Sequence, residues 1–197
     1  KKITLTATIA GATDSRVALN EVNEYDEKYG KDVPTIKVNW KVSDEKFTVY
    51  NADYSGKADF TQDSGNEFTS KDALPDGIKT AYYGNYIFSN SALSYDLSSQ
   101  DGTLNENYIL MQAPVTDGSS NITFEHRTAI LKVEFKGVNN QDVTKIVMDN
   151  VHTGSNNESI TITPTQASLG YFYIFLPIEN EGGYVVGHTF NFTVTAD

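Results

Sequence analysis

The sequence predicts an all-β protein with the fold class of a β-sandwich. Apolar and polar residues alternate with a period of two in many short segments, which is the pattern of strands with one buried face. The composition is also that of strands, since the chain has 12 Tyr and 10 Phe against 1 Trp and 2 Met. Turn-forming residues separate about ten or eleven such segments, a spacing typical of sandwiches.

Charge and cysteine content exclude several classes of protein. The 197 residues include 15 basic and 26 acidic ones, for a formal net charge of −11. A nucleic-acid-binding surface needs a basic patch, and no segment supplies one, so we expect no nucleic-acid partner. The chain has no cysteine, which excludes disulfides, thiol catalysis and thiolate-bound metals. No run of about 18 apolar residues is present, so no transmembrane segment is predicted.

The first part of the chain contains a strong strand, a long polar segment and a hairpin. Residues 13–34 are polar, acidic and rich in turn formers, so most of them are predicted to form a loop. Residues 36–41 and 47–49 both alternate, and the Ser-Asp-Glu sequence between them predicts the sharp connection of a β-hairpin. Residues 3–9 alternate apolar side chains with Thr. The apolar face of this first strand consists of Ile3, Leu5, Ala7 and Ile9.

The strand predicted to lie at the centre of a sheet covers residues 121–136. It holds two period-two patterns back to back, with a break at Arg127-Thr128. Its apolar side chains are enriched in β-branched and aromatic types, and the charged residues Lys132, Glu134 and Lys136 lie between them. One face is therefore expected to be buried and both edges paired.

The remaining segments are weaker. Residues 51–77 carry few apolar side chains and are expected to form short strands and exposed loops. Other strands are predicted at 82–88, 108–115, 145–148, 160–162, 169–178 and 190–194, of which 169–178 has no polar face. The side chains expected in the core are Trp40, Phe124, Leu131, Val133, Phe135, Ile174, Leu176 and Phe192.

The chain length suits one large all-β domain over 1–197. The alternative is two sub-domains, 1–137 and 138–197. Because the sequence stops straight after a strong strand, we expect the domain to be a module of a longer protein.

The sequence holds no pattern of catalytic residues, so we expect no enzymatic activity. Its three histidines, His126, His152 and His188, are far apart and lack metal-ligand spacing, so no transition metal is expected. No nucleophile or phosphate-binding motif is present, and no spacing pairs two carboxylates. We therefore expect no cofactor, although acidic loops such as 53–63 carry the ligand type for a weakly bound calcium ion.

One aromatic segment is a candidate ligand platform. Tyr82, Tyr83 and Tyr86 lie close together, and Tyr offers a large contact area at a low entropic cost. The simpler interpretation, which we favour, is that these rings pack against one another on the sheet.

The order of four segments resembles the fimbrillin-like cell-adhesion and pilin-subunit family of Bacteroidales surfaces. The opening strand is followed by Ser15-Arg16, as in that family. A short Met-Ala segment within 108–115 precedes the central strand. The hairpin positions of the family are matched by Val38, Trp40, Asp44, Phe47 and Val49, although Ser43 replaces the more usual glycine. The central-strand positions are matched by Phe124, His126, Ala129 and Val133. The resemblance covers about residues 1–150 and is weaker from 155 onward.

This resemblance implies a transthyretin-like or Greek-key β-sandwich, and the chain would be the N-terminal domain of such a protein. The protein would be exported to the cell surface, in the outer membrane or a fimbria, and its full-length form would be lipid-anchored. The implied function is cell adhesion and assembly by β-strand exchange, with neighbouring fimbrial subunits or host and bacterial surface ligands as partners. Residues 3–9 are then the assembly strand, and Arg16 lies in a protease-sensitive loop that would release it. Two other functions stay open: a glycan-binding or nutrient-capture module, and an accessory domain of a polysaccharide-active enzyme.

Overall fold

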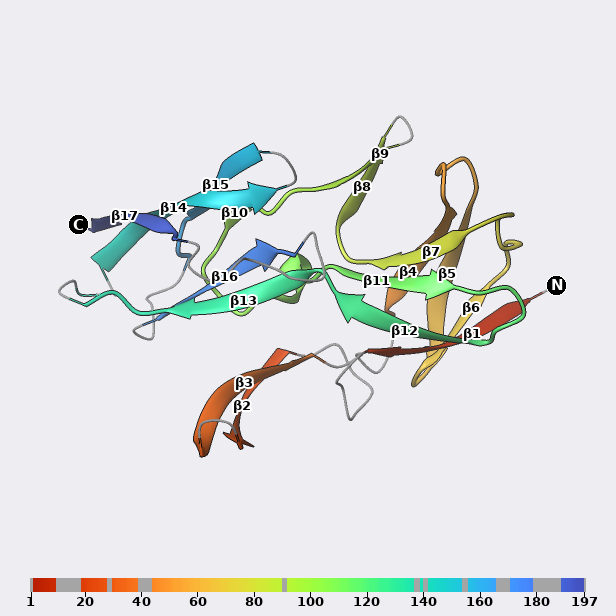
Figure 1. Cartoon of the computed structure of the whole chain (residues 1–197), viewed down its shortest axis with the longest axis horizontal. Helices are drawn as coiled ribbons and strands as arrows, with labels where there is room; N and C mark the ends of the chain where they lie inside the picture. The colour runs from red at the N-terminus through yellow and green to blue at the C-terminus, as the bar shows by residue number, and fades with distance from the viewer. Residues whose placement is uncertain are drawn as a thin grey trace. The chain divides into compact units, whose positions relative to one another are not determined.

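The computed structural model describes residues 2–9, 19–27, 30–38, 44–89, 92–136, 139, 142–153, 156–165, 171–178 and 189–196. They form strands β1 to β17 and one short 3-10 helix, η1, so the predicted all-β, sandwich-type fold is confirmed (Figure 1). The Greek-key order and the transthyretin-like likeness stay predictions.

The chain divides into two compact units, and neither is continuous in sequence. The first unit comprises Lys1–Ser94 and Leu110–His126, and the second comprises Tyr95–Ile109 and Arg127–Asp197. The alternative boundary at 137–138 does not coincide with this division. The single domain over 1–197 stays a prediction.

The main sheet of the first unit closes into a barrel of seven strands. Their order around the barrel is β1-β12-β11-β7-β4-β5-β6. Every pair is antiparallel except β1 and β12, which run parallel. The barrel strands are β1 Ile3–Ile9, β4 Lys46–Asn51, β5 Lys57–Ser64, β6 Glu67–Ser70, β7 Lys79–Tyr83, β11 Met111–Val115 and β12 Asn121–His126.

The barrel interior is filled by the apolar residues that alternate along these strands. Phe47 lies at the centre of an aromatic group: its ring centroid is 5.0 Å from that of Phe60, 4.9 Å from Phe68 and 5.3 Å from Phe124. All four side chains are buried. Such offset and edge-on ring pairs stabilise a core beyond the area that they bury.

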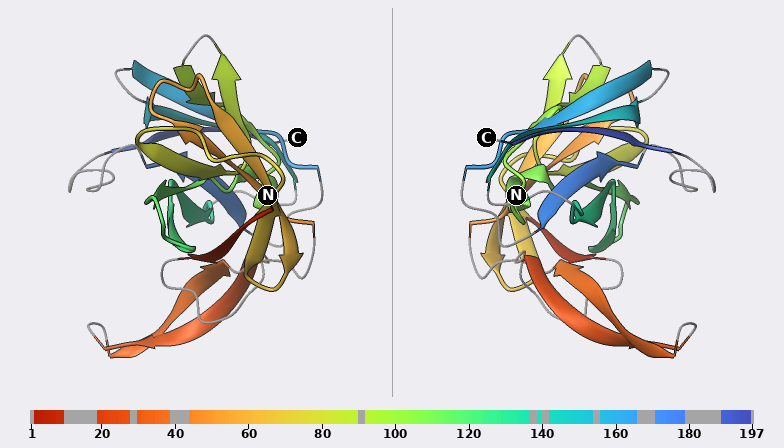
Figure 2. Two further views of the ribbon diagram at one scale, coloured as in Figure 1. Left: turned by 90° about the vertical axis from the view of Figure 1, so that its right-hand side faces the viewer. Right: turned by 90° about the vertical axis from the view of Figure 1, so that its left-hand side faces the viewer.

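Two hairpins accompany the barrel in the chain. Strands β2 (Leu19–Asp26) and β3 (Lys31–Val38) form a two-stranded ribbon (Figure 2), and β8 (Tyr86–Ser89) pairs with β9 (Ala92–Tyr95). The turn of the first hairpin contains Gly30, whose φ of 62° lies in the left-handed region that favours glycine.

The second unit is a sandwich of two sheets around one core. One sheet has the order β10-β15-β14-β17, and the other pairs β13 with β16. Its elements are β10 Ser99–Gln100, η1 Glu106–Tyr108, β13 Thr128–Val133, β14 Val143–Thr153, β15 Asn156–Ile162, β16 Phe172–Pro177 and β17 Asn191–Ala196. Buried side chains of both sheets form the core: Val143, Ile146, Met148, Val151, Ile160, Ile162, Phe172, Ile174 and Leu176.

A side-chain amide links the two sheets of this unit. The Oε1 atom of Gln100 accepts a hydrogen bond from the Phe175 N–H at 2.8 Å, and its Nε2 atom donates to the Phe175 carbonyl at 2.8 Å and to the Leu97 carbonyl at 2.9 Å. The amide therefore takes the place of a neighbouring strand for one residue of β16. Gln100 is only 3% exposed, so these hydrogen bonds satisfy groups that water does not reach.

The predicted central strand over 121–136 is wrong as a single strand. It divides at Arg127 into β12 of the barrel and β13 of the second unit. Strand β12 has both edges paired, as expected, whereas β13 pairs with β16 alone in the part of the chain that the structure describes. The break in the hydrophobic pattern at Arg127-Thr128 is the point where the chain passes from one unit to the other.

The predictions for residues 13–49 need two corrections. The predicted long loop contains β2, whose eight residues pair in register with β3. The predicted hairpin of residues 36–41 with 47–49 does not form, because β3 pairs with β2 and β4 pairs with β5 and β7. The alternation of apolar and polar residues reveals a strand and its buried face. It does not reveal the neighbouring strand, because any strand that buries the same face can pair with it.

Other boundaries shift by a few residues. The segment 51–77 contains two short strands, β5 and β6, with turns and loops around them, as expected. The strand expected over 82–88 is interrupted at Gly84, and the one over 108–115 begins after η1. Strand β16 is buried at all six positions, so the absence of a polar face in 169–178 was read correctly.

The predicted core is right in part. Phe124, Ile174 and Leu176 are buried, whereas Leu131, Val133 and Phe135 are half-buried against the core of the second unit. Phe192 is 36% exposed, because β17 lies at a sheet edge with most of its side chains exposed. Trp40 lies outside the described residues.

Replacing Gly102 by Ala is expected to lower the free energy of unfolding by about 2 kcal/mol, from overpacking and backbone strain. Its φ is 75°, and an added Cβ would lie 2.9 Å from Ile162 Cγ2 and 3.2 Å from Phe172 Cδ1. Gly118→Ala is the matched control, since its φ is 79° with nothing within 4 Å. Urea unfolding of both variants measures the difference; equal losses would contradict the packing account.

Candidate functional site

Strand β1 is the closing strand of the barrel. It runs parallel to β12 from Thr6 opposite Asn121, and antiparallel to β6 from Ile3 opposite Ser70. Its backbone is hydrogen-bonded on both sides: the Thr6 N–H donates to the Ser120 carbonyl at 2.7 Å, and the Ala7 N–H donates to the Asn66 carbonyl at 2.8 Å.

The predicted apolar face of β1 points into the barrel. Leu5 is 1% exposed and Ala7 is 0% exposed, while Ile3 is half-buried. The backbone of Ile9 belongs to β1, but its side chain lies outside the described residues, as does Arg16. Removing β1 would expose the apolar interior that Leu5 and Ala7 occupy, together with unpaired edges of β6 and β12.

The sequence pattern of β1 occurs a second time, in β17. Aligned without a gap, Ile3-Thr-Leu-Thr-Ala7 corresponds to Phe192-Thr-Val-Thr-Ala196, with apolar residues at the same three positions and Thr at the same two. Among the described residues, strand β17 pairs with β14 alone and so lies at the edge of its sheet. Our sequence reasoning missed this repeat, although the alternation with Thr was visible in both segments.

The three predicted platform tyrosines do not share one face. Tyr83 points into the barrel, is 9% exposed and donates a hydrogen bond from its hydroxyl to Glu45 Oε2 at 2.7 Å. Burial, the hydrogen bond to Glu45 and its negative charge all raise the pKa of the Tyr83 hydroxyl. Including Tyr83 in the platform was wrong, because successive side chains of β7 alternate between the two faces of the sheet.

Tyr82 and Tyr86 belong to a group of five half-buried rings on the outer side of the barrel sheet, here called the aromatic cluster. Its closest pair is Tyr50 and Phe88, stacked with centroids 3.8 Å apart, and Tyr82 lies 5.2 Å from Tyr86. The Tyr54 and Tyr82 hydroxyls are 3.3 Å apart. The rings therefore pack against one another, as we favoured. The aromatic cluster consists of Tyr50, Tyr54, Tyr82, Tyr86 and Phe88.

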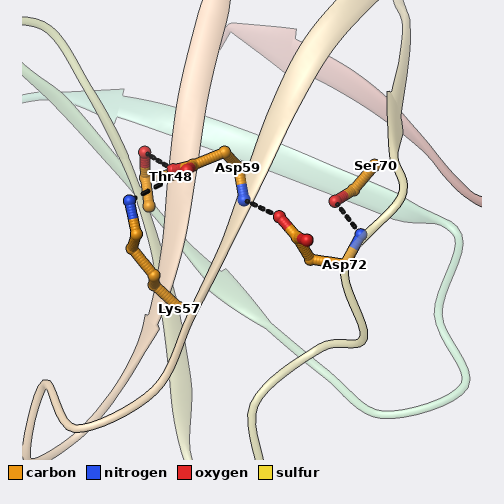
Figure 3. Close-up of polar contacts among 5 residues, drawn as sticks. All are labelled: Thr48, Lys57, Asp59, Ser70 and Asp72. Carbon is orange, nitrogen blue, oxygen red and sulfur yellow. Dashed lines mark hydrogen bonds and ion pairs between the residues drawn. The ribbon is translucent and has the colours of Figure 1, made fainter.

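A row of polar side chains, drawn in Figure 3, continues from the aromatic cluster, because Thr48 lies opposite Tyr82 and Lys57 lies opposite Tyr50 in the strand register. Asp59 Oδ1 accepts a hydrogen bond from Thr48 Oγ1 at 2.8 Å, and its Oδ2 lies 2.9 Å from Lys57 Nζ. The Asp59 N–H donates to Asp72 Oδ2 at 3.4 Å, and the Asp72 N–H donates to Ser70 Oγ at 3.0 Å. Burial opposes ionisation of Asp59, but the hydrogen bonds from Lys57 and Thr48 and the charge of Lys57 outweigh it and lower its pKa.

This row leads into an open cavity of about 660 Å³ on the first unit. Hydroxyl, carboxylate and ammonium groups line it, and it has no aromatic wall of its own. Its lining residues are Lys2, Asp59, Thr61, Thr69, Ser70, Lys71 and Asp72.

The family-motif positions are divided between the two units, and Trp40 lies outside the described residues. Phe124 fills the barrel core, Asp44 adopts a positive φ of 71° just before β4, and Ala129 lies half-buried in β13 of the second unit. His126 ends β12 and pairs in register with Met111.

His126 is expected to make stability depend on pH. Burial lowers its pKa from the ordinary value of 6.5. The unfolded chain then takes up the proton first, so the free energy of unfolding should fall as the pH drops below about 6.5. Urea unfolding at pH 7.5 and 5.5 measures this fall, which should be smaller in His126→Gln; an equal fall in both proteins would contradict it.

The described part of the chain contains no group of three or more His, Asp or Glu side chains placed to hold a metal ion. Within the same residues, no helix is long and apolar enough to span a membrane. Comparison of the chain with protein-family models, curated proteins and solved structures finds no match.

Proposed function

We propose that this protein is a non-enzymatic cell-surface subunit that assembles by β-strand exchange, in which β17 of one copy replaces β1 in the barrel of another. The observation that carries the proposal is the repeat of the β1 pattern in β17. In the aligned register, Val194 takes the buried position of Leu5, and Ala196 takes that of Ala7. The resemblance to fimbrillin-like proteins supports the same function.

The small residue at the Ala7 position gives the exchange its specificity. Ala7 is fully buried, so a larger side chain there would overpack the barrel. Of the aligned residues in β17, Ala196 is the one that meets this requirement, and Thr193 and Thr195 fall on the outer face with Thr4 and Thr6. The incoming strand would also satisfy the unpaired backbone edges of β6 and β12.

Exchange requires that β1 be released first. While β1 is covalently attached, its high effective concentration in its own barrel excludes a strand from another molecule. Cleavage after Arg16, between β1 and β2, would remove this advantage. Assembly is thus controlled by proteolysis, as the resemblance also implies.

The proposal is tested by cutting the protein with an Arg-specific protease and measuring the mass of the products by light scattering. Arg16 and Arg127 are the two arginines, so an Arg127→Lys background confines the cut to Arg16. We expect monomers before the cut and head-to-tail oligomers after it.

Two variants at neighbouring positions sharpen this test. Ala196→Glu places a charge in the buried Ala7 position and should abolish the oligomers, whereas Thr195→Glu places it on the outer face and should keep them. Both residues are exposed in β17, so both monomers should fold. The proposal would be contradicted if the cleaved protein remained monomeric. It would also be contradicted if the cleaved Ala196→Glu variant formed as many oligomers as the cleaved parent.

A further inference from the structure

The aromatic cluster, the polar row and the cavity form one continuous strip across the outer face of the barrel. The strand register shows this directly, since Tyr82 of β7 lies opposite Thr48 of β4, and Thr48 lies opposite Asp59 of β5. Tyr50 lies opposite Lys57 in the same way. From β7 across β4 and β5 to β6 the strip spans about 14 Å, given a strand spacing of about 4.8 Å.

The two ends of the strip offer complementary chemistry. At one end, half-exposed rings provide apolar surface, with the Tyr54 and Tyr82 hydroxyls close together. At the other end, Asp72 and Lys71 provide a carboxylate and an ammonium group at the cavity. A ligand that fits both ends must carry apolar patches and many hydroxyls on one extended frame.

The charges along the strip are locally balanced, although the whole chain has a net charge of −11. Lys57 lies beside Asp59, and Lys2 Nζ lies 2.8 Å from Asp63 Oδ2. This balance suits an uncharged ligand and disfavours a polyanion such as nucleic acid. An added peptide strand is also disfavoured, because the barrel is closed and offers no edge on this face.

We propose that this strip binds a neutral saccharide chain, with sugar rings stacked on the aromatic cluster and hydroxyls hydrogen-bonded to the polar row and the cavity. Sugar rings carry C–H faces that pack on aromatic rings, and vicinal hydroxyls match paired carboxylate and ammonium groups. Several rings in a row are needed to reach from Tyr82 to Asp72. This site does not depend on strand exchange.

The test uses NMR titration of the intact protein with hexasaccharides of β-1,4-glucose, β-1,3-glucose, β-1,4-mannose and β-1,4-xylose. We expect at least one of them to bind, with shifts confined to strands β4 to β8, the loop that contains Tyr54, and the cavity residues around Lys2 and Asp72. Asp72→Ala and Tyr54→Ala should each weaken that binding at least tenfold, whereas Thr123→Ala, on the outer face of β12, should leave it unchanged.

Because Asp72 is exposed and follows the end of β6, its replacement should leave the fold intact even if Tyr54→Ala does not. Binding of none of the four saccharides, binding with shifts elsewhere, or affinity of Asp72→Ala within twofold of the parent would each overturn the proposal.

Discussion

Replacing Phe124 by Ala is expected to lower the free energy of unfolding of the first unit by about 4 kcal/mol. The Phe124 ring is fully buried and meets the Phe47 ring edge-on at 5.3 Å. Truncation removes the buried area of the ring and leaves a cavity beside Phe47, whose ring is held in place by its contacts with Phe60 and Phe68. Urea unfolding, followed by the fluorescence of the barrel tyrosines, measures the loss.

The neighbouring residue provides the control. Glu125 is exposed on the same strand, and Glu125→Ala is expected to change the same free energy by less than about 0.5 kcal/mol. Similar losses for the two variants would mean that β12 does not present Phe124 to the barrel interior.

Replacing Gln100 by Leu is expected to lower the free energy of unfolding of the second unit by about 3 kcal/mol. Leu has a similar size but cannot form hydrogen bonds, so the N–H and carbonyl of Phe175 would both lose their partner in a buried environment. Hydrogen exchange of the Phe175 amide reports this loss locally, and urea unfolding reports it globally.

Ser99→Ala, at the exposed neighbouring position of β10, is the control and should leave both measurements unchanged. If Gln100→Leu were as stable as the parent, the amide would not be holding β16 to the other sheet.

The fold was predictable from the sequence where burial alone determines the pattern. The alternation in residues 3–9 and the fully apolar run in 169–178 predict β1 and β16, because each reports which faces of one strand meet the core. Pairing was not predictable in the same way. The partner of β3 depends on a turn at Gly30, and the division of 121–136 depends on two cores that only the folded chain defines.

The candidate site was predictable to a smaller extent. Tyr82 and Tyr86 could be chosen from composition, but the cluster also needs Tyr50 and Tyr54, which come from a strand and a loop far away in the sequence. Tyr83 was included because composition carries no information on which face of β7 it occupies. The link from the cluster to Asp72 requires the strand register, which the sequence does not contain.

The most direct test of strand exchange is a disulfide that joins β17, lying in the place of β1, to the neighbouring strand β6 of another copy. Thr6 lies opposite Glu67, with both side chains away from the barrel interior, and the Thr6 N–H points to β12 rather than β6. Such non-hydrogen-bonded pairs have Cα atoms about 4.5 Å apart, a spacing that a disulfide can bridge. In an exchanged assembly Thr195 takes the position of Thr6, and the parent chain has no cysteine to interfere.

The measurement is non-reducing electrophoresis of the variant that combines Glu67→Cys, Thr195→Cys and Arg127→Lys after mild oxidation. Our account predicts a ladder of linked copies only after cleavage at Arg16. Either single-cysteine protein should give at most dimers. No ladder should form when Val194→Cys replaces Thr195→Cys, because Val194 would face the barrel interior. Absence of a ladder after cleavage, or an equal ladder without it, would contradict strand exchange between β1 and β17.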